Sequence, residues 1–396
     1  MEDLSRYEGI IKESKLEDFK KLPGSFWIIS SYFNPENIKD KKQNYLLFRE
    51  KLKKQGVNLL TVECAFKEQN FTLDKEDADI LIQVRSDSVL WQKERLLNIG
   101  LEHLPADCDK IAWLDADVLI LDDDWARKVE TLLERYPIVK PFDEAIRLTK
   151  RESNKILKGK GDELKNLFAY RNRVITNYYQ SSTTWKLIFL AVFGMCARRE
   201  VYEAAGFYDA MIICSGDVVM ANAFLYQNSR ARDLKDRFHL TDGLMTDIDD
   251  WYAKLSPRRT EFGICYLKTI SMLHLYHGKM MNRKYEETCK ILVKYKFDPK
   301  KDLKINEYGC YEWSSFKPEL HQGLIDYFHA RNEDDRILTN LINFTILGLK
   351  NLKDRRYILR IKNYCHFLFH RSLGLLGKLI KYISPKFYKL IKLIKD

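Results

Sequence analysis

Two aspartates at the end of an apolar run are the residues of this chain best suited to chemistry. Asp115 and Asp117 lie within IAWLDADVLI, residues 111–120, whose apolar members indicate a buried strand: Ile111, Ala112, Trp113, Val118 and Leu119. An acidic pair in such a place is unfavourable unless a positive charge binds it. Carboxylates at positions i and i+2 can turn toward one cation, and oxygen ligands of this kind suit Mn²⁺ or Mg²⁺. We therefore predict a divalent-cation site whose open coordination positions accept a substrate diphosphate.

A solvated turn in front of a helix is the ordinary alternative for such an acidic cluster. It fits the next three acidic residues, Asp122, Asp123 and Asp124. The last of them precedes WARKVETLLERY as a helix N-cap, and acidic groups favour a helix start. For Asp115 and Asp117, the buried strand in front favours the metal site.

The composition predicts a chain that is globular over most of its length. The 396 residues are 45% hydrophobic and 13% aromatic, enough for a large core in one domain or two. The eight cysteines form no C-x-x-C pair, which argues against a zinc ribbon or a disulfide framework and fits a reducing compartment. Residues 1–23 form a polar leader that lacks the apolar core of a signal peptide. We therefore predict a cytoplasmic location.

The net charge of +11 comes from one end of the chain. Residues 350–396 contain thirteen Lys and Arg against two Asp, which leaves 54 basic and 54 acidic residues in positions 1–349. A nucleic-acid enzyme more usually carries basic residues across its working face. The distribution therefore argues against a nucleic-acid partner and favours an attachment segment.

The same basic tail has the period of amphipathic helices. Apolar residues recur by three and four from Leu373 to Ile394, lysines fall on the opposite side, and Pro385 divides the pattern into two helices. The lysines recur too often for the segment to span a bilayer. We predict that it lies on an anionic membrane surface, which makes the protein peripheral on the inner face of a membrane. The alternative is an amphipathic hairpin packed on the domain or on another subunit.

Strands and helices alternate in the first part of the sequence. Strands are expected at 26–31, 57–66 and 77–84, and helices at 41–56 and 91–104. This order predicts an α/β fold with a mixed, mainly parallel sheet flanked by helices, whose ligand sites lie beyond the strand ends. Three residues at such ends are candidate ligand contacts, with ordinary loop chemistry as the alternative: Ser31, Phe33 and Glu63.

The helix in front of the acidic strand carries a family resemblance. The segment RLLNIG, residues 95–100, followed by a strand that ends in Asp115-Ala116-Asp117, resembles GT-A glycosyltransferases, in particular the β-1,4-galactosyltransferases and their bacterial relatives. The resemblance implies a GT-A, Rossmann-like domain over residues 24–349 that binds Mn²⁺ or Mg²⁺ and a nucleotide-sugar, expected to be a UDP-sugar. In that family a basic residue at the helix start touches the nucleotide. Lys93 matches it by position, and Arg95 is the neighbouring alternative.

The middle of the sequence predicts an excursion from the sheet and a return to it. Residues 146–182 are charged and poorly periodic, and we interpret them as a mobile insertion, either a functional lid or a solvated loop. The apolar run Leu187–Phe193 is too short to span a bilayer and is predicted to be another buried strand.

A second acidic landmark is Asp217, in a Ser-Gly-Asp turn before the apolar segment VVMANAF. The turn predicts a carboxylate at the mouth of a buried helix, held by backbone N–H groups. With GFYD at 206–209, it resembles the turn that carries the catalytic base of inverting GT-A enzymes, although a cysteine and a serine stand where glycines and a glutamate are common. The resemblance implies that Asp217 is the base, and a plain N-cap aspartate is the alternative.

Two histidines close a later apolar strand. His274 and His277 precede a basic loop, residues 279–284, that begins with Lys279. The resemblance implies that a histidine here is a further metal ligand, with His277 as the first choice and His274 as the alternative. It also implies that the basic loop, through Lys279, covers the diphosphate. Neutral imidazole suits Mn²⁺ beside carboxylates.

Together these patterns predict a metal-dependent glycosyltransferase. It would move a sugar from a nucleotide-sugar to a hydroxyl of a glycan or lipid-linked acceptor, with inversion, while Asp115, Asp117 and His277 hold the cation. Two other classes stay open. A metal-dependent nucleotidyltransferase would release pyrophosphate, and a non-catalytic scaffold on a membrane surface would need the tail alone.

Overall fold

The computed structural model describes residues 5–14, 19–159, 183–213, 215–226, 235, 240–255, 259, 261–283 and 285–333. Three predictions fall outside the described residues: the membrane-binding tail 350–396, residues 160–182 of the insertion, and Lys284 of the basic loop. In the part of the chain that is described, no helix is long and apolar enough to cross a membrane.

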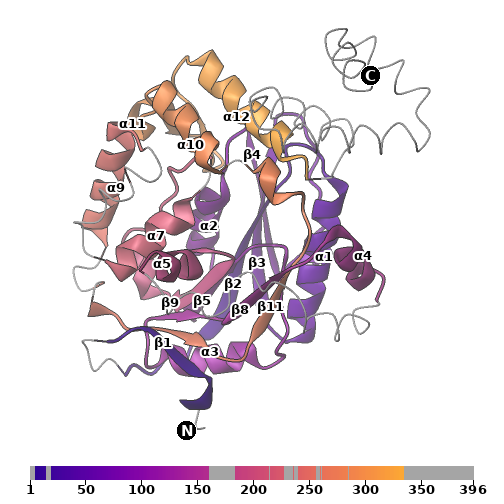
Figure 1. Ribbon diagram of the computed structural model, residues 1–396, viewed down its shortest axis with the longest axis vertical. Coiled ribbons are helices and arrows are strands. Elements are labelled where there is room, and N and C mark those ends of the chain that lie inside the picture. Colours follow the sequence, from indigo (N-terminus) through magenta and orange to yellow (C-terminus); the bar gives the residue numbers. More distant parts are fainter. Residues whose placement is uncertain are drawn as a thin grey trace, which may run out of the picture. The chain divides into compact units, whose positions relative to one another are not determined.

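An eight-stranded sheet forms the centre of the fold (Figure 1). Its strands are β1 (Glu8–Lys12), β2 (Ser25–Phe33), β3 (Asn58–Phe66), β4 (Ile80–Ser86), β5 (Cys108–Leu114), β7 (Ile138–Lys140), β9 (Gly194–Arg198) and β10 (Ile264–Leu267). Their order is β1-β10-β7-β9-β5-β2-β3-β4. Six of the eight run in one direction, and β1 and β9 run in the other. The predicted mixed, mainly parallel sheet is confirmed.

Helices cover both faces of this sheet (Figure 1). Helix α1 (Lys39–Lys54) packs on one face, where the Tyr45 hydroxyl lies 2.9 Å from that of Thr61 in β3. Helix α2 (Lys93–Glu102) packs on the other face, where Gly100 lies against Leu60 and Val62 of the same strand. Since successive residues of a strand point to opposite faces, these contacts place the two helices on opposite sides of the sheet.

The remaining elements surround this core. The other α-helices among the described residues are α3 (Trp125–Leu133), α4 (Lys150–Leu157), α5 (Thr183–Ala191), α6 (Glu200–Glu203), α7 (Gly216–Leu225), α9 (Asp242–Lys254), α10 (Tyr285–Lys294), α11 (Pro299–Asp302) and α12 (Pro318–Arg331). A three-stranded sheet has the order β6 (Val118–Ile120), β11 (Ser271–His274), β8 (Glu144–Arg147). A two-stranded sheet pairs β12 (Leu303–Ile305) with β13 (Tyr311–Trp313).

The apolar run Leu187–Phe193 is not the predicted strand. It forms most of helix α5, which ends at Ala191, and strand β9 begins only at Gly194. An unbroken apolar run has neither a strand nor a helix period, so either structure can bury it. Here α5 packs against both α7 and β9, and Leu187, Phe189 and Leu190 are all buried.

The acidic strand also differs from its prediction. The chain leaves β5 at Leu114, turns through residues 115–117 and enters β6, which belongs to the smaller sheet. Val118 and Leu119 therefore do not continue the strand that precedes the aspartates. At the other end of the sheet, residues 8–12 of the predicted polar leader form β1, an edge strand antiparallel to β10.

Candidate active site

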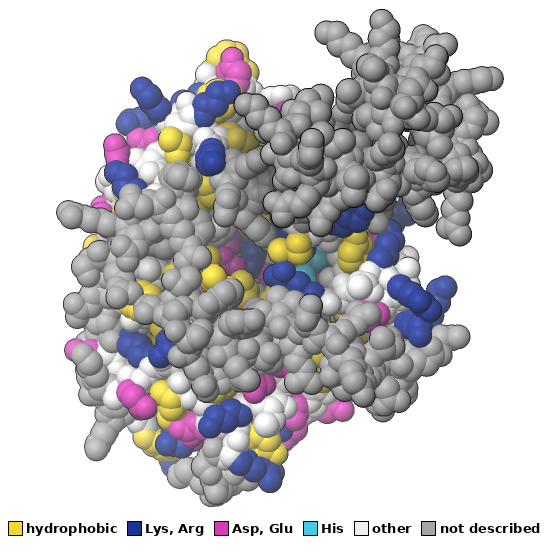
Figure 2. All heavy atoms as spheres, in the orientation of Figure 1, with side chains coloured by type: hydrophobic (Ala, Val, Ile, Leu, Met, Phe, Trp, Pro, Cys, Tyr) yellow, Lys and Arg dark blue, Asp and Glu magenta, His cyan; other side chains and the backbone are white. Residues whose placement is uncertain are grey.

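A cavity of about 470 Å³ opens at the carboxyl ends of β2 and β5. Segments far apart in the sequence line it: the end of β2, the 115–117 turn, the first turns of α2 and α7, the end of β11 and residues 331–333. In Figure 2, histidine, basic and acidic side chains lie together around a hollow near the centre of the face that it shows. This is the position at which parallel α/β sheets bind ligands.

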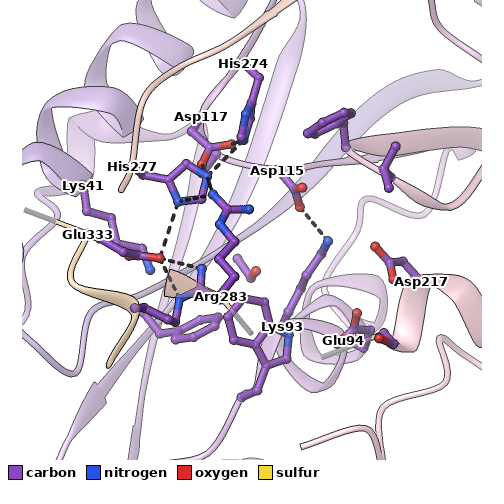
Figure 3. A pocket seen from close by; sticks show the side chains of 18 of the residues that line it. Lys41, Lys93, Glu94, Asp115, Asp117, Asp217, His274, His277, Arg283 and Glu333 are labelled. Atoms are coloured by element: carbon purple, nitrogen blue, oxygen red, sulfur yellow. Dashed lines mark hydrogen bonds and ion pairs between the residues drawn. The ribbon is translucent and has the colours of Figure 1, made fainter. Parts of the chain in front are cut away.

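Three potential metal ligands meet on one side of the cavity (Figure 3). Asp117, His274 and His277 each offer one ligand atom, and these atoms lie within 4.8 Å of one another. His277 Nε2 is 3.2 Å from Asp117 Oδ2 and 3.0 Å from His274 Nε2, and His274 Nε2 is 3.6 Å from Asp117 Oδ1. Imidazole nitrogens with a carboxylate form a donor set that suits Mn²⁺.

Strand pairing brings these three residues together. Strand β6 pairs antiparallel with β11 so that Val118 lies opposite His274, and the Leu275 N–H donates to the Asp117 carbonyl at 2.9 Å. His277 is oriented from its other side, where Nδ1 lies 3.4 Å from Glu333, a carboxylate that Arg331 holds at 2.8 Å. Such outer partners fix which ring nitrogen faces a metal.

The environment of the cluster fits a cation. Asp117 Oδ1 is a buried atom that has no hydrogen-bond partner in the part of the chain that the structure describes. Burial raises the pKa of Asp117 and lowers the pKa of His274 well below its usual value. His274 is therefore neutral, which is the form in which imidazole binds metals. A cation would supply a positive charge to compensate the buried Asp117 carboxylate.

Asp115 points to a different partner. Its carboxylate lies 2.6 Å from the ammonium of Lys93, and it is not among the three residues of the cluster (Figure 3). Asp115 and Asp117 are two residues apart in a turn between two sheets, so their side chains reach different neighbours. The structure thus brings together Asp117, the first-choice His277 and the alternative His274. A metal contact of Asp115 stays a prediction.

Lys93 projects into the cavity from the start of α2, as its predicted role requires. It is buried, with its ammonium 4.5 Å from the centre of the Trp113 ring. Burial lowers the pKa of Lys93, but the carboxylates of Asp115 and Asp217 outweigh that effect, so that its pKa is raised and it is positively charged. Arg95 points away from the cavity and donates to the Gly309 carbonyl.

Asp217 lines the cavity at the first turn of α7, beyond Lys93 as seen from the metal cluster (Figure 3). Ser215 precedes the helix in the left-handed conformation, with φ of 76°, and the Val218 N–H donates to the Asp217 carboxylate at 2.8 Å. Burial raises the pKa of Asp217, and Lys93 counteracts this increase. The carboxylate is thus held at a helix start and faces the cavity.

The other predicted contacts divide into two groups. Ser31 and Phe33 line the cavity. Glu63 does not: it is buried, and its carboxylate accepts hydrogen bonds from the Thr72 and Leu73 N–H groups, so it holds a loop. Lys279 is exposed and does not line the cavity, whereas Arg283 of the same basic loop does. Neither Glu63 nor Lys279 is therefore placed to contact a ligand in this cavity.

Sequence reasoning missed several residues that line the cavity. Four are basic and two are acidic: Lys41, Arg147, Arg283, Arg331, Glu94 and Glu333. Arg283 lies in the basic loop that the sequence singled out, and Glu94 is next to Lys93, so both had a signal nearby. The others lie on elements whose position around the cavity no local pattern reveals.

No protein-family model matches the sequence, and no curated protein matches it. Among solved structures, a fragment of S. aureus TarS in complex with UDP-GlcNAc aligns at a TM-score of 0.36 and 9% identity, over 86% of this chain and 80% of that one. Glucosyl-3-phosphoglycerate synthase from Mycobacterium tuberculosis with Mg²⁺ and UDP aligns at 0.33 and 10%, over 74% and 87%.

A third solved structure is a mutant of Drosophila β-1,4-galactosyltransferase 7 in complex with manganese, UDP-Gal and xylobiose. It aligns at a TM-score of 0.28 and 14% identity, over 53% of this chain and 61% of that one. The structures that this chain resembles are GT-A glycosyltransferases, the class that its motifs resemble. At TM-scores of 0.28–0.36 and identities of 9–14%, none of them bears on the chemistry of this chain, which we infer from its own residues.

Proposed function

We propose that this chain is a metal-dependent glycosyltransferase that moves a sugar from a nucleotide-sugar, expected to be a UDP-sugar, to an acceptor hydroxyl. One observation carries the proposal. A single cavity is lined by the cluster of Asp117, His274 and His277 on one side and by Asp217 on the other, with Lys93 between them (Figure 3). A donor with a diphosphate at one end and a reactive sugar carbon at the other needs this order of groups.

Each group has a role in that reaction. Asp117, His274 and His277 would hold Mn²⁺ or Mg²⁺, and a bound cation offsets the charge that develops on the departing nucleoside diphosphate. Lys93, whose ammonium pairs with Asp115, places a positively charged hydrogen-bond donor between the cluster and Asp217. The basic side chains of Arg147, Arg283 and Arg331 add to the positive lining.

Asp217 is the proposed base. It would take the proton of an acceptor hydroxyl as that oxygen forms a bond to the anomeric carbon and the bond to the diphosphate breaks. Because the base and the cluster that binds the leaving group lie on opposite sides of the cavity, attack comes from the face opposite the leaving group, which inverts the configuration. The acceptor is proposed to be a glycan or a lipid-linked hydroxyl.

A binding experiment tests the proposal. Nucleotide-sugars are screened by thermal shift with and without Mn²⁺, and a UDP-sugar is expected to raise the melting temperature only when Mn²⁺ is present. Asp117→Asn is expected to abolish this shift and the transfer of sugar. Asp123→Asn is the matched control, because Asp123 is exposed and pairs with Lys51. A wild-type shift that persists in Asp117→Asn would overturn the metal site.

The product separates the proposed reaction from nucleotidyl transfer at the same site. A glycosyltransferase releases a nucleoside diphosphate, whereas a nucleotidyltransferase releases pyrophosphate. Phosphorus NMR of the reaction mixture distinguishes the two products. Release of pyrophosphate with no nucleoside diphosphate would favour the second class.

The basic tail supports a proposal about location. Its surplus of eleven positive charges and its amphipathic period favour contact of residues 350–396 with an anionic membrane surface, peripheral on the cytoplasmic face. Removal of residues 372–396 is expected to release the protein from acidic liposomes while turnover on a soluble acceptor is kept. Loss of folding in the truncated chain would support a packed hairpin instead.

A further inference from the structure

A second carboxyl group lies beside Asp217, and none of the roles above uses it. Glu94, in the first turn of α2, lines the cavity with only 2% of its surface exposed. Figure 3 shows it next to Asp217, on the side of Lys93 away from the metal cluster. The distal part of its side chain lies directly against Gly216: a Cβ built on that glycine would be 2.7 Å from Glu94 Cδ and 2.8 Å from Oε1.

The carboxyl of Glu94 has no partner from another described residue. Among the described residues, no hydrogen bond or ion pair joins it to another side chain, although Lys93 and Asp217 are near enough to affect its charge. Among the described residues its hydrogen-bond partner is its own backbone N–H, and a buried carboxyl with so few partners is costly. It also does not serve the fold in the way that Glu63 does, because among the described residues no backbone N–H of another residue donates to it.

Glu94 is in the right form to bind a polyol. Burial raises the pKa of Glu94 to about 8, with Lys93 opposing and the carboxylates of Asp217 and Asp115 adding to the increase. At neutral pH the group is therefore mainly protonated. A neutral carboxyl donates one hydrogen bond and accepts others, which is the pattern that a sugar hydroxyl complements.

We propose that Glu94 is a substrate-binding residue whose carboxyl group hydrogen-bonds a carbohydrate hydroxyl beside the reacting centre. The proposal rests on the proposed function, since it assumes that Asp217 faces a sugar-transfer reaction. Gly216 is part of the same proposed binding site. The absence of a side chain at that position leaves the space in which the Glu94 carboxyl lies, and this explains why the turn before Asp217 carries a glycine.

Two substitutions at Glu94 test this role. Glu94→Gln keeps one donor and one acceptor in the same shape and is expected to change substrate binding by no more than about threefold. Glu94→Ala removes both and is expected to weaken the recognised substrate by about tenfold, the effect of one lost hydrogen bond. A variant Glu94→Gln that is impaired as much as Glu94→Ala would overturn the proposal, because it would indicate an ionised carboxylate.

Three affinities, all measured with Mn²⁺ present, identify the substrate that carries the hydroxyl. If Glu94→Ala weakens the UDP-sugar and leaves UDP unchanged, the hydroxyl belongs to the donor sugar. If it raises the KM for the acceptor and leaves the affinities for UDP and the UDP-sugar unchanged, the hydroxyl belongs to the acceptor. No change in any of the three, or an equal loss for UDP and UDP-sugar, would overturn the proposal.

Gly216→Ala provides a second test that leaves Glu94 in place. The new methyl group would meet the flexible end of Glu94, and alanine at this helical position keeps the backbone as it is. It is expected to give the same selective loss as Glu94→Ala, but no additional loss when combined with Glu94→Ala. Additive losses would mean that the two residues act independently and would contradict the proposed binding site.

The wild-type protein separates this proposal from the proposed function. If the wild type binds UDP in the presence of Mn²⁺, and the Glu94 and Gly216 variants match it in affinity for UDP, in affinity for the UDP-sugar and in the KM for the acceptor, the role of Glu94 is overturned and the glycosyltransferase proposal stays intact. A wild type that binds neither UDP nor any UDP-sugar would overturn both.

Discussion

Helix α2 has charged groups on two faces, buried on the cavity face and partly buried on the other, and the two sets differ in how many partners they have. On the face away from the cavity, Asp209 accepts hydrogen bonds from Asn98 at 2.8 Å, from the Tyr311 hydroxyl at 2.8 Å and from Arg95 at 3.2 Å. On the cavity face, Lys93 has a single carboxylate partner at 2.6 Å, and Glu94 has no partner from another described residue.

This difference separates charged groups that stabilise the fold from charged groups whose missing partners a ligand could supply. A buried charge with a complete set of partners holds elements together, whereas an incomplete set costs stability until something else completes it. Size is a poorer guide. The hollow beside Arg95 and Asp209 has a volume of about 670 Å³, against about 470 Å³ for the cavity beside Lys93. The smaller space is nevertheless the better candidate for catalysis.

The largest effect is expected at Asp217. Asp217→Asn keeps the shape of the side chain but cannot accept the acceptor's proton, so kcat should fall about 10²–10⁴-fold while the affinity for the UDP-sugar is kept. Steady-state kinetics and calorimetric titration measure the two quantities. Asp247→Asn, in the hollow on the other face, is the matched control and should keep normal turnover. Normal turnover of Asp217→Asn would remove the base assignment.

A second prediction concerns the two aspartates of the 115–117 turn. Among the described residues Asp117 Oδ1 accepts no hydrogen bond, although His274 Nε2 lies 3.6 Å from it, whereas Asp115 already pairs with Lys93. His274→Asn should therefore weaken Mn²⁺ binding by about 10–100-fold, and Asp115→Asn by clearly less. Calorimetric titration of each variant with Mn²⁺ measures the difference. Equal losses would instead make Asp115 a ligand of the cation, as the sequence predicted.

The third prediction compares two basic residues of one helix. Lys93→Gln should weaken UDP binding about tenfold or more with little loss of stability, because its charge faces the cavity. Arg95→Gln should keep UDP binding but lower the free energy of unfolding by roughly 2–4 kcal/mol, because it leaves the Asp209 carboxylate, which is only 15% exposed, without its cation. Chemical denaturation and nucleotide titration of both variants test the pair. A reversed outcome would refute the distinction between the two faces.

Local patterns were sufficient for four of the eight strands of the central sheet, β2 to β5, and for several residues at strand ends. The strands and helices expected before residue 104 all form, because their apolar periods are clear and glycines or prolines bound them. The position of Asp117 after a buried strand predicts its role, whereas the roles of Lys93, Asp217 and His277 are what the family resemblance implies. All four lie near strand or helix ends, and such ends meet at one edge of a parallel sheet.

The parts that sequence could not supply depend on contacts between distant segments. Leu187–Phe193 has no period, so its helical form follows only from its burial against α7 and β9. The metal cluster depends on the pairing of β6 with β11, which makes His274 a neighbour of Asp117. Glu94 carries no motif of its own. Its interest lies in its contact with Gly216 and in the absence of a partner from any other residue that the structure describes, and neither is visible in a linear sequence.

The smallest expected effect, on stability, sharpens the comparison at Glu94 itself. Its pKa rises from 4.5 in the unfolded chain to about 8 in the fold, mainly through burial, so the folded protein keeps a proton that the unfolded chain releases. This contribution destabilises the fold progressively as the pH rises from about 4.5 to 8. Glu94→Gln cannot ionise, and it should gain on the order of 1–3 kcal/mol relative to wild type between pH 5 and pH 8. Urea unfolding at both pH values measures the gain.

Glu102→Gln, at the exposed end of the same helix, should follow the wild type. A constant difference between wild type and Glu94→Gln at both pH values would mean that Glu94 is ionised in the fold, and the cavity face of α2 would then hold a satisfied charge like the face that carries Arg95.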